Sequence, residues 1–223
     1  MIESIGGGWG GTLVGRLAVS DREALEAFLA DVWASRECEV YPSKGQVFRA
    51  LEMTPLVEVK AVIVGQDPYP TKGQACGLAF SVPQILPPRI RRPHSLGRIL
   101  TELRREGYRA PKRATLEPWT DQGVLLLNSA LTYSVDDAGH SRVWKPFTTA
   151  VIRALVERTD PIAFLLWGKH AQEWRDLIKT PHKAVCSPHP MARGRAAHFA
   201  RSSPFSRANA ALGDERKIDW SLG

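Results

Sequence analysis

The sequence has few cysteines and no long hydrophobic run. Its three cysteines, Cys38, Cys76 and Cys186, show no CxxC spacing and are odd in number, which argues against a disulfide framework and against a zinc site. The longest apolar runs, such as 162–167, are far shorter than the roughly 18 residues that indicate a membrane span. The first residues, MIESIGGGWGG, contain no apolar signal-peptide core. We therefore expect a cytoplasmic protein that does not enter a membrane.

The composition is that of a globular domain with an uneven charge distribution. The 223 residues are 43% hydrophobic and carry a formal net charge of +7, and this length fits one domain over 1–223. Between 89 and 113 the only acidic residues are Glu102 and Glu106. The basic residues there are Arg89, Arg91, Arg92, Arg98, Arg104, Arg105, Arg109, Lys112 and Arg113. A second stretch, 193–207, has four arginines and no acid. Such runs indicate either a nucleic-acid surface or a solvated face.

Short apolar runs alternate with helix-like segments along the chain. The runs at 57–64, 124–127, 162–167 and 183–186 have the character of buried strands. Helix-like segments lie at 21–34, 95–106, 145–158, 169–178 and 205–213. Short buried strands separated by helices imply parallel pairing with both sheet faces covered. We therefore expect an α/β fold, a three-layer sandwich in which helices flank a central, mostly parallel four-stranded sheet.

Several side chains capable of chemistry or ligand binding follow the predicted strands. Asp67 lies in the proline-stiffened loop GQDPYP, with Phe80 downstream; Asn128 ends LLLN, and His189 lies in SPHP. Ligands of open α/β sheets bind outside the carboxyl ends of the strands, so these residues are expected on one rim. Each also has a structural interpretation: a turn-forming aspartate, a core phenylalanine, a backbone-bonded amide and a packing histidine.

The motifs that carry these residues occur in a characteristic order. GQDPY at 65–69 precedes GLAFSVP at 77–83, LLLN at 125–128 with SALT at 129–132, LLWGKHAQ at 165–172 and HP at 189–190. In this order and spacing, over about 45–213, the chain resembles the family 1 uracil-DNA glycosylases. The resemblance implies a monofunctional DNA repair enzyme without metal or cofactor. Such an enzyme flips uracil out of the stack and hydrolyses its bond to deoxyribose, leaving free uracil and an abasic site.

The resemblance assigns the chemistry to two residues. Asp67 would stabilise the oxocarbenium-like sugar and orient or deprotonate the attacking water, because a carboxylate opposes developing positive charge. His189 would donate to uracil O2 as negative charge grows there, with its imidazole held neutral. Backbone amides near Gln66 would assist. In this chain Pro70 replaces the histidine that follows the tyrosine in the family, a change that should leave Asp67 in place.

Base recognition is likewise implied for a small set of pocket residues that includes Gln66. Asn128 would read the Watson–Crick edge of uracil, accepting from N3–H and donating to O4, a pattern that cytosine reverses. Phe80 would stack on the base. Tyr69 would occupy the space that the methyl group of thymine needs.

Two segments depart from the family pattern. Most relatives follow HP with Ser-Pro-Leu-Ser, whose serines touch phosphate and whose leucine wedges into the base stack. The ungapped alignment puts Met191 at a serine and Arg193 at the leucine. We expect Arg193 to enter or span the duplex through hydrogen bonds and phosphate contact, and its guanidinium group can also stack on bases. The alternative is a shifted loop with Met191 or another residue as the wedge. Since a phage inhibitor protein encloses the leucine wedge of many relatives, its binding is expected to be weakened here.

The second departure is the loop 86–95, which is longer and more basic than the Pro-Pro-Ser stretch of the family. Arg89, Arg91 and Arg92 are expected to contact DNA together with Ser95, and Ser187 is expected to do so from the loop that carries the histidine. Extra arginines make substrate and abasic-product binding tight and salt-sensitive, since each neutralised phosphate releases counterions.

Three other functions remain open from the residues alone. They are the same fold with altered base scope, an inert protein that binds uracil or abasic sites in DNA, and a hydrolase of small nucleosides. Intact Asp67 and His189 weigh against the inert binder, and the basic stretches weigh against the nucleoside hydrolase. The protein is expected to act as a monomer on single- or double-stranded DNA.

Overall fold

A parallel four-stranded sheet forms the centre of the computed structural model, which describes residues 1–34, 39–135, 140–192 and 198–223. The strands are β2 (Ala61–Gly65), β3 (Val124–Asn128), β5 (Ala163–Trp167) and β6 (Lys183–Ser187), in the spatial order β3-β2-β5-β6. All three pairings are parallel. Every residue of β2, β3 and β5 is buried, whereas β6 at the sheet edge is partly exposed. The near-continuous apolar sequence of the inner strands follows from having both faces covered.

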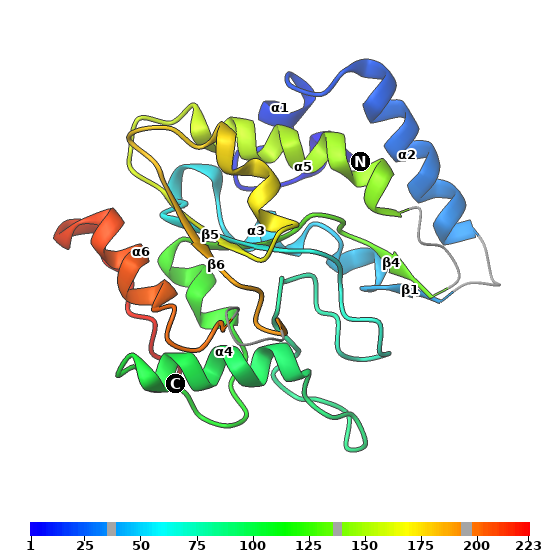
Figure 1. Ribbon diagram of the computed structural model, residues 1–223. Coiled ribbons are helices and arrows are strands. Elements are labelled where there is room, and N and C mark those ends of the chain that lie inside the picture. The colour runs from blue at the N-terminus through cyan, green and yellow to red at the C-terminus, as the bar shows by residue number, and fades with distance from the viewer. Residues whose placement is uncertain (35–38, 136–139, 193–197) are drawn as a thin grey trace.

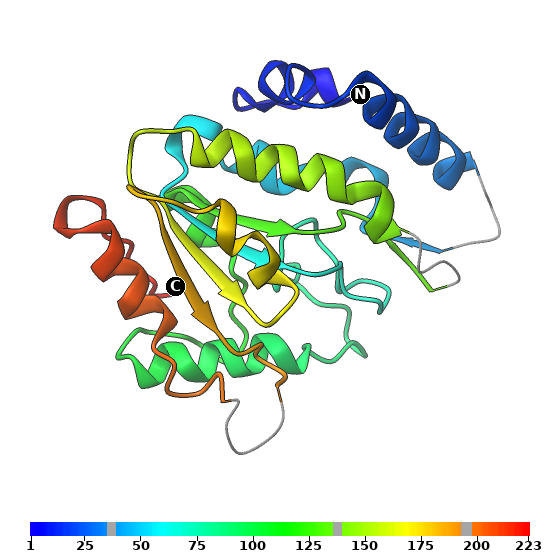
Figure 2. The same cartoon turned by 45° about the horizontal axis from the view of Figure 1, so that its top comes forward.

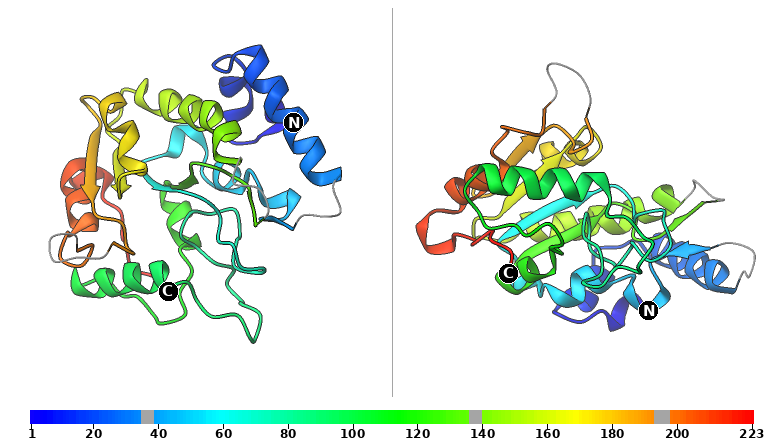
Figure 3. Two further views of the ribbon diagram at one scale, coloured as in Figure 1. Left: turned by 45° about the vertical axis from the view of Figure 1, so that its right-hand side comes forward. Right: turned by 90° about the horizontal axis from the view of Figure 1, so that it is seen from below.

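Helices cover both faces of this sheet (Figures 1 and 2). On one face lie α4 (His94–Arg105) and α6 (Pro204–Leu212), and on the other α3 (Arg49–Met53) and α5 (His140–Val156). The N-terminal α1 (Trp9–Val14) and α2 (Val19–Ala34) pack outside α5. The view from below in Figure 3 shows α4 running across the sheet. The expected three-layer α/β fold is therefore confirmed, with an additional outer layer.

Short elements complete the architecture. An antiparallel ribbon pairs β1 (Val40–Tyr41) with β4 (Tyr133–Ser134). Short 3-10 helices lie between or beyond the larger elements: η1 (Ile2–Ser4), η2 (Lys44–Gln46), η3 (Leu56–Glu58), η4 (Glu117–Gln122), η5 (Ala171–Leu177) and η6 (Asp214–Arg216). One hydrophobic cluster runs from Ile2 to Leu222 through the sheet. The apolar side of α4, with Leu96, Ile99 and Leu103 fully buried, has the i, i+3, i+7 spacing of an amphipathic helix.

The structure differs from the sequence-based expectation in three places. The first strand begins at Ala61 rather than at 57, because 56–58 form a 3-10 turn after Pro55. The segment 169–178 contains 3-10 helix rather than α-helix. The β1–β4 ribbon has strands of two residues, too short to leave a pattern.

Two further sequence inferences concern cysteines and membranes. Cys76 and Cys186 are free thiols, and Cys38 lies outside the described residues. None of the helices in the described ranges combines the length and the apolar character needed to cross a membrane.

Candidate active site

A small cavity opens at the carboxyl ends of β2 and β5. We call it the base pocket; its volume is about 180 Å³, below the roughly 300–1,000 Å³ of sites for drug-sized ligands, so it suits one small ring. Its walls come from the ends of β2 and β5 and from two loops. They are Val64, Gly65, Gln66, Phe80, Trp167, Gly168, Lys169, His170, Ala171 and His189. Three residues expected at the site, Gln66, Phe80 and His189, thus meet around one cavity.

Asn128 adjoins the wall of this pocket through its neighbour on β2. Parallel register places it opposite Gly65, and a Cβ atom at Gly65 would lie 2.3 Å from Asn128 Oδ1. Only glycine therefore allows the amide to lie there. The Asn128 side chain is 6% exposed and makes no hydrogen bond to the described part of the chain. A nearly buried amide with its donors and acceptor unused fits an edge of a ligand better than a structural role.

His189 is held in one protonation state and close to the strand ends. The backbone N–H of Met191 donates to His189 Nδ1 at 3.0 Å, so Nδ1 accepts and the proton of the neutral ring lies on Nε2. Burial lowers the pKa of His189 below that of a free imidazole. A Cβ atom on Gly168, whose φ is +89°, would lie 2.8 Å from His189 Cβ. Glycine at this position lets the histidine pack against the end of β5.

Phe80 has a strained backbone conformation, and its carbonyl accepts a hydrogen bond from Tyr69. Phe80 is 9% exposed and has a φ of 60°, a conformation that is unusual for a bulky residue and is found where structure enforces it. The Tyr69 hydroxyl bonds to the Phe80 carbonyl at 2.9 Å and to Ser95 Oγ at 2.9 Å. The Phe80 ring lies 5.3 Å from Trp167 and 5.9 Å from His189. These contacts fix an aromatic wall for the base pocket.

Ser95, expected at a DNA phosphate, has a different immediate partner. It is 8% exposed at the start of α4, and its hydroxyl bonds to Tyr69. Its contact in the structure therefore positions the tyrosine.

The Asp67 carboxyl group is half-buried directly after β2. Burial raises the pKa of Asp67 above the ordinary value of an aspartate, while the positive potential of nearby His170 and hydrogen bonding with Gln66 act in the opposite direction. A perturbed carboxyl group beside a cavity is a frequent property of catalytic acids and bases. Asp67 lies beside the lining of the base pocket rather than in it.

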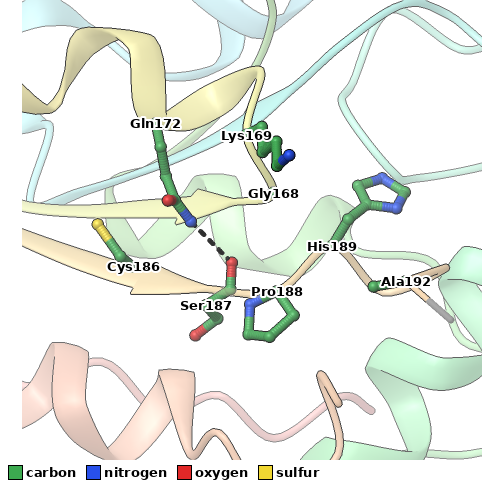
Figure 4. Close-up of a pocket in the computed structure, with 8 residues that line it drawn as sticks. All are labelled: Gly168, Lys169, Gln172, Cys186, Ser187, Pro188, His189 and Ala192. Atoms are coloured by element: carbon green, nitrogen blue, oxygen red, sulfur yellow. Dashed lines mark hydrogen bonds between the residues drawn. The ribbon is translucent and has the colours of Figure 1, made fainter. Parts of the chain in front are cut away.

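A second cavity, of about 510 Å³, lies beside the base pocket and shares Gly168, Lys169 and His189 with it. Figure 4 shows its lining, with the His189 ring turned away from Cys186. Gln172 Nε2 donates to the Ser187 carbonyl at 3.0 Å, joining η5 to β6. Ser187, expected at DNA, is 4% exposed, and its Oγ atom has no partner among the described residues. In this conformation its hydroxyl is closed off from a phosphate.

The loop 83–93, called the basic loop below, carries the arginines of the predicted loop 86–95 and ends at 93, because α4 begins at His94. It is partly exposed and is held by hydrogen bonds. Gln74 Nε2 donates to the Arg91 carbonyl at 2.8 Å, and the backbone N–H of Ile90 donates to Pro87 at 2.9 Å. Arg89 and Arg91 are exposed, and Arg92 is half-buried. Burial lowers the pKa of Arg92, and the nearby positive charges of Arg104 and Arg113 act in the same direction. The loop thus brings cations together at the edge of the site.

Two residues that line the base pocket were not expected at the site from the sequence. Lys169 and His170 line the base pocket, although the motif that contains them served in the sequence only to mark the family. Their position after a buried strand was the signal that could have identified them.

Arg193 lies outside the described residues, and Met191 is half-buried beside His189. Across the described ranges, no group of three or more His, Cys, Asp and Glu side chains could hold a metal ion.

Comparison with known proteins gives a consistent result. Residues 52–213 match the family described as the Uracil DNA glycosylase superfamily. A protein of Streptococcus equi subsp. zooepidemicus named uracil-DNA glycosylase is 44% identical over 202 residues, covering 88% of this chain and 89% of that protein. One of the same name from Deinococcus deserti is 41% identical over 223 residues, covering 96% and 86%.

Solved structures agree with this result. A crystal structure of mimivirus uracil-DNA glycosylase is 26% identical with a TM-score of 0.73, covering 94% of this chain and 89% of that chain. A variant of mimivirus UNG, solved in complex with UGI, is 25% identical with a TM-score of 0.74, covering 94% and 91%.

Proposed function

The chain belongs to the uracil DNA glycosylase superfamily and excises uracil from DNA, and we propose that Asp67 and His189 carry out this hydrolysis of the N-glycosidic bond. The observation that carries the proposal is the state of His189: its Nδ1 accepts from Met191, which leaves a neutral ring with an Nε2–H donor at the base pocket.

The reaction assigns a separate task to each residue. When the bond between C1′ and N1 breaks, its electron pair leaves with uracil, and negative charge grows on O2. The Nε2–H of His189 donates to that oxygen, and its lowered pKa keeps the ring from arriving as a cation. The Asp67 carboxylate stabilises the positive sugar and accepts the proton of the water that adds to C1′. Its raised pKa suits a base that must take up a proton.

Recognition of uracil rests on four side chains around the pocket. The unbonded amide of Asn128 reads N3–H and O4, and Phe80 stacks on the ring, with Gln66 closing the same wall. Tyr69 blocks the methyl position of thymine, and its bonds to Phe80 and Ser95 keep it from moving aside.

DNA is held by the loops around the pocket. Arg89, Arg91 and Arg92 bind phosphates next to the flipped nucleotide. Met191 contacts the DNA strand from its position after His189, and Arg193, which lies outside the described residues, acts as the wedge. Ser95 is bonded to Tyr69 and Ser187 is buried, so both reach the DNA backbone only after a rearrangement. The protein works as a cytoplasmic monomer of one domain on single- or double-stranded DNA and retains the abasic product.

The test is a comparison of base release by matched variants. Wild type, Asp67→Asn and Asp121→Asn, the last an exposed carboxylate elsewhere, are incubated with labelled uracil-containing single- and double-stranded DNA, and abasic sites are counted. Asp67→Asn lacks the general base, so its rate of uracil release should fall by roughly 10²–10⁴, whereas Asp121→Asn should match wild type. If wild type bound the DNA without forming abasic sites, the protein would be an inert binder. Full activity of Asp67→Asn would contradict the proposed role of Asp67.

A further inference from the structure

Helix α4 contacts both ends of the segment that connects β6 to α6. At the first end, Arg98 Nη1 donates to the carbonyl of Pro190 at 2.8 Å and to that of Ala192 at 3.4 Å. At the second end, the Glu102 carboxylate accepts the backbone N–H groups of Arg201 and Ser203 at 3.0 and 3.1 Å. Arg98 and Glu102 are one helical turn apart, or about 6 Å along the axis. The two ends of the segment are thus pinned to adjacent positions on one rigid helix.

Glu102 is a fully satisfied, buried carboxylate. It is 1% exposed and, besides the two backbone donors, accepts from Arg105 Nε at 2.8 Å and Arg105 Nη2 at 2.9 Å. Four donors fill the acceptor positions of its two oxygens. Burial raises the pKa of Glu102, but the bonds from Arg105 and the two backbone amides outweigh burial, so the pKa lies below the ordinary value. The group is therefore ionised when it holds the turn.

The turn that Glu102 holds is strained. Arg201 and Ser203 have φ values of 71° and 48°, in the left-handed region that non-glycine residues adopt at a cost. Both of these N–H groups point to the same carboxylate. A charge-assisted bond to each residue offsets the strain, and without Glu102 the turn loses the interaction that favours this conformation.

We propose that Arg98 and Glu102 are positioning residues that fix the two described ends of this connection, Pro190 to Ala192 and Arg201 to Ser203, for action on uracil-containing DNA. The proposal rests on the proposed function, in which His189 acts on the base and residues after it, Arg193 included, contact duplex DNA. Arg98 acts on the end next to His189, so its loss affects the chemical step. Glu102 acts on the far end, so its loss affects the binding of duplex DNA. Preorganisation of this kind lowers the ordering cost paid on binding.

The experiment measures kcat and KM on single- and double-stranded uracil-containing DNA, with the thermal unfolding midpoint of each protein. The variants are Arg98→Met, Arg98→Lys, which keeps a cationic donor, and Glu102→Gln. Glu117→Gln is the matched control. Glu117 also pairs with an arginine, Arg49, at 2.6 Å, but it is more exposed than Glu102 and makes no hydrogen bond to the described ends of this connection.

Each position has its own expected signature. Glu102→Gln should raise KM for duplex DNA about tenfold, the effect of losing a hydrogen bond to a charged group, with kcat on single strands changed by less than about threefold. Arg98→Met should lower kcat about tenfold on both substrates, with Arg98→Lys recovering part of the loss.

The outcomes separate this proposal from the proposed function. Absence of uracil release by wild type would overturn the proposed function itself. With an active wild type, equal effects of Glu102→Gln on the two substrates, or effects no larger than those of Glu117→Gln at equal loss of stability, would overturn the positioning role of Glu102. Arg98 is exposed, so its variants fold and keep the proposal testable even if Glu102→Gln does not; wild-type kinetics of Arg98→Met would overturn the role of Arg98.

Discussion

The base pocket and the basic loop 83–93 are built in different ways. Pocket residues follow directly from strand ends, where parallel register sets Gly65 against Asn128 and Trp167 against Ser187. The loop 83–93 has no regular structure, and Arg89 and Arg91 on it are exposed. Hydrogen bonds to its backbone carbonyls, such as the one from the Gln74 side chain to Arg91, help to fix its course.

This difference matches the physical task of each region. Charge stabilisation needs fixed dipoles in a site of low dielectric, so the pocket is buried and the pKa values of Asp67 and His189 are shifted. Binding a polyanion needs accessible cations, and exact placement matters less because phosphates repeat along the strand. Mutations in the pocket should therefore change the rate strongly, whereas mutations in the loops should change affinity and its salt dependence.

Removing the His189 imidazole should have the largest effect in this comparison. His189→Ala leaves the oxygen of the departing uracil without its donor and should lower kcat by roughly 10²–10³, the usual loss for one such donor. Single-turnover excision measures this directly. A loss confined to KM would instead place His189 among the DNA-binding residues.

The pH profile of the wild type sharpens this result. Asp67 must be ionised, and its pKa is raised, so the rate should fall as the pH drops through that raised value. The pKa of His189 is lowered, so protonation of the ring begins only at lower pH than in a free histidine. An activity that rises as the pH falls from 7 would contradict both assignments.

Tyr69 tests whether the pocket excludes thymine by shape. Tyr69→Ala should lower uracil excision by roughly 10–100-fold, since it opens the aromatic wall, and should add slow thymine excision. Tyr69→Phe is the matched control: it keeps the ring and loses the bonds to Phe80 and Ser95, which costs about 1 kcal/mol of folding stability. Thymine release by neither variant would show that the tyrosine does not block the methyl group.

Arg193 tests the loops with duplex against single-stranded substrate. Arg193→Ala should weaken binding to duplex DNA containing uracil or an abasic site by roughly tenfold, while excision from single strands changes little, because only a duplex has a stack to enter. An equal loss of activity on duplex and single-stranded DNA would contradict the role of Arg193 as the wedge. Binding of the inhibitor protein UGI to wild type is measured in parallel. A variant of mimivirus UNG was solved in complex with UGI, so binding here need not be weakened, and full inhibition at stoichiometric amounts would contradict the expected effect of Arg193.

The basic loop should have the smallest effect on the rate of excision, because its arginines act on the affinity for DNA and on the salt dependence of that affinity. The combined variant Arg89→Ala, Arg91→Ala and Arg92→Ala should reduce the slope of log affinity against log salt by roughly 0.9 for each arginine that binds a phosphate. Arg153→Ala, an exposed arginine on α5, is the control. An unchanged slope in the triple variant would assign the loop to solvated surface.

The two regions also differ in how much of each could be predicted from the sequence. The apolar runs predicted four buried strands, and the rule that ligands bind at their carboxyl ends located Asp67, Asn128 and His189. For Ser95 and Ser187 the family resemblance implied only a DNA contact, because a sequence does not show that one hydroxyl bonds to Tyr69 and the other is buried. The role of these serines toward DNA stays a prediction.

The sequence by itself determined the fold class, the family and the residue types at the strand ends, since local hydrophobic pattern and motif order are properties of neighbouring residues. Tertiary structure alone decided which tautomer His189 adopts, why Gly65 and Gly168 are required, and how Glu102 reaches a strained turn about a hundred residues away. These features depend on contacts between segments distant in the chain. Their energies come from burial and hydrogen-bond geometry, which exist only once the sheet and α4 have assembled.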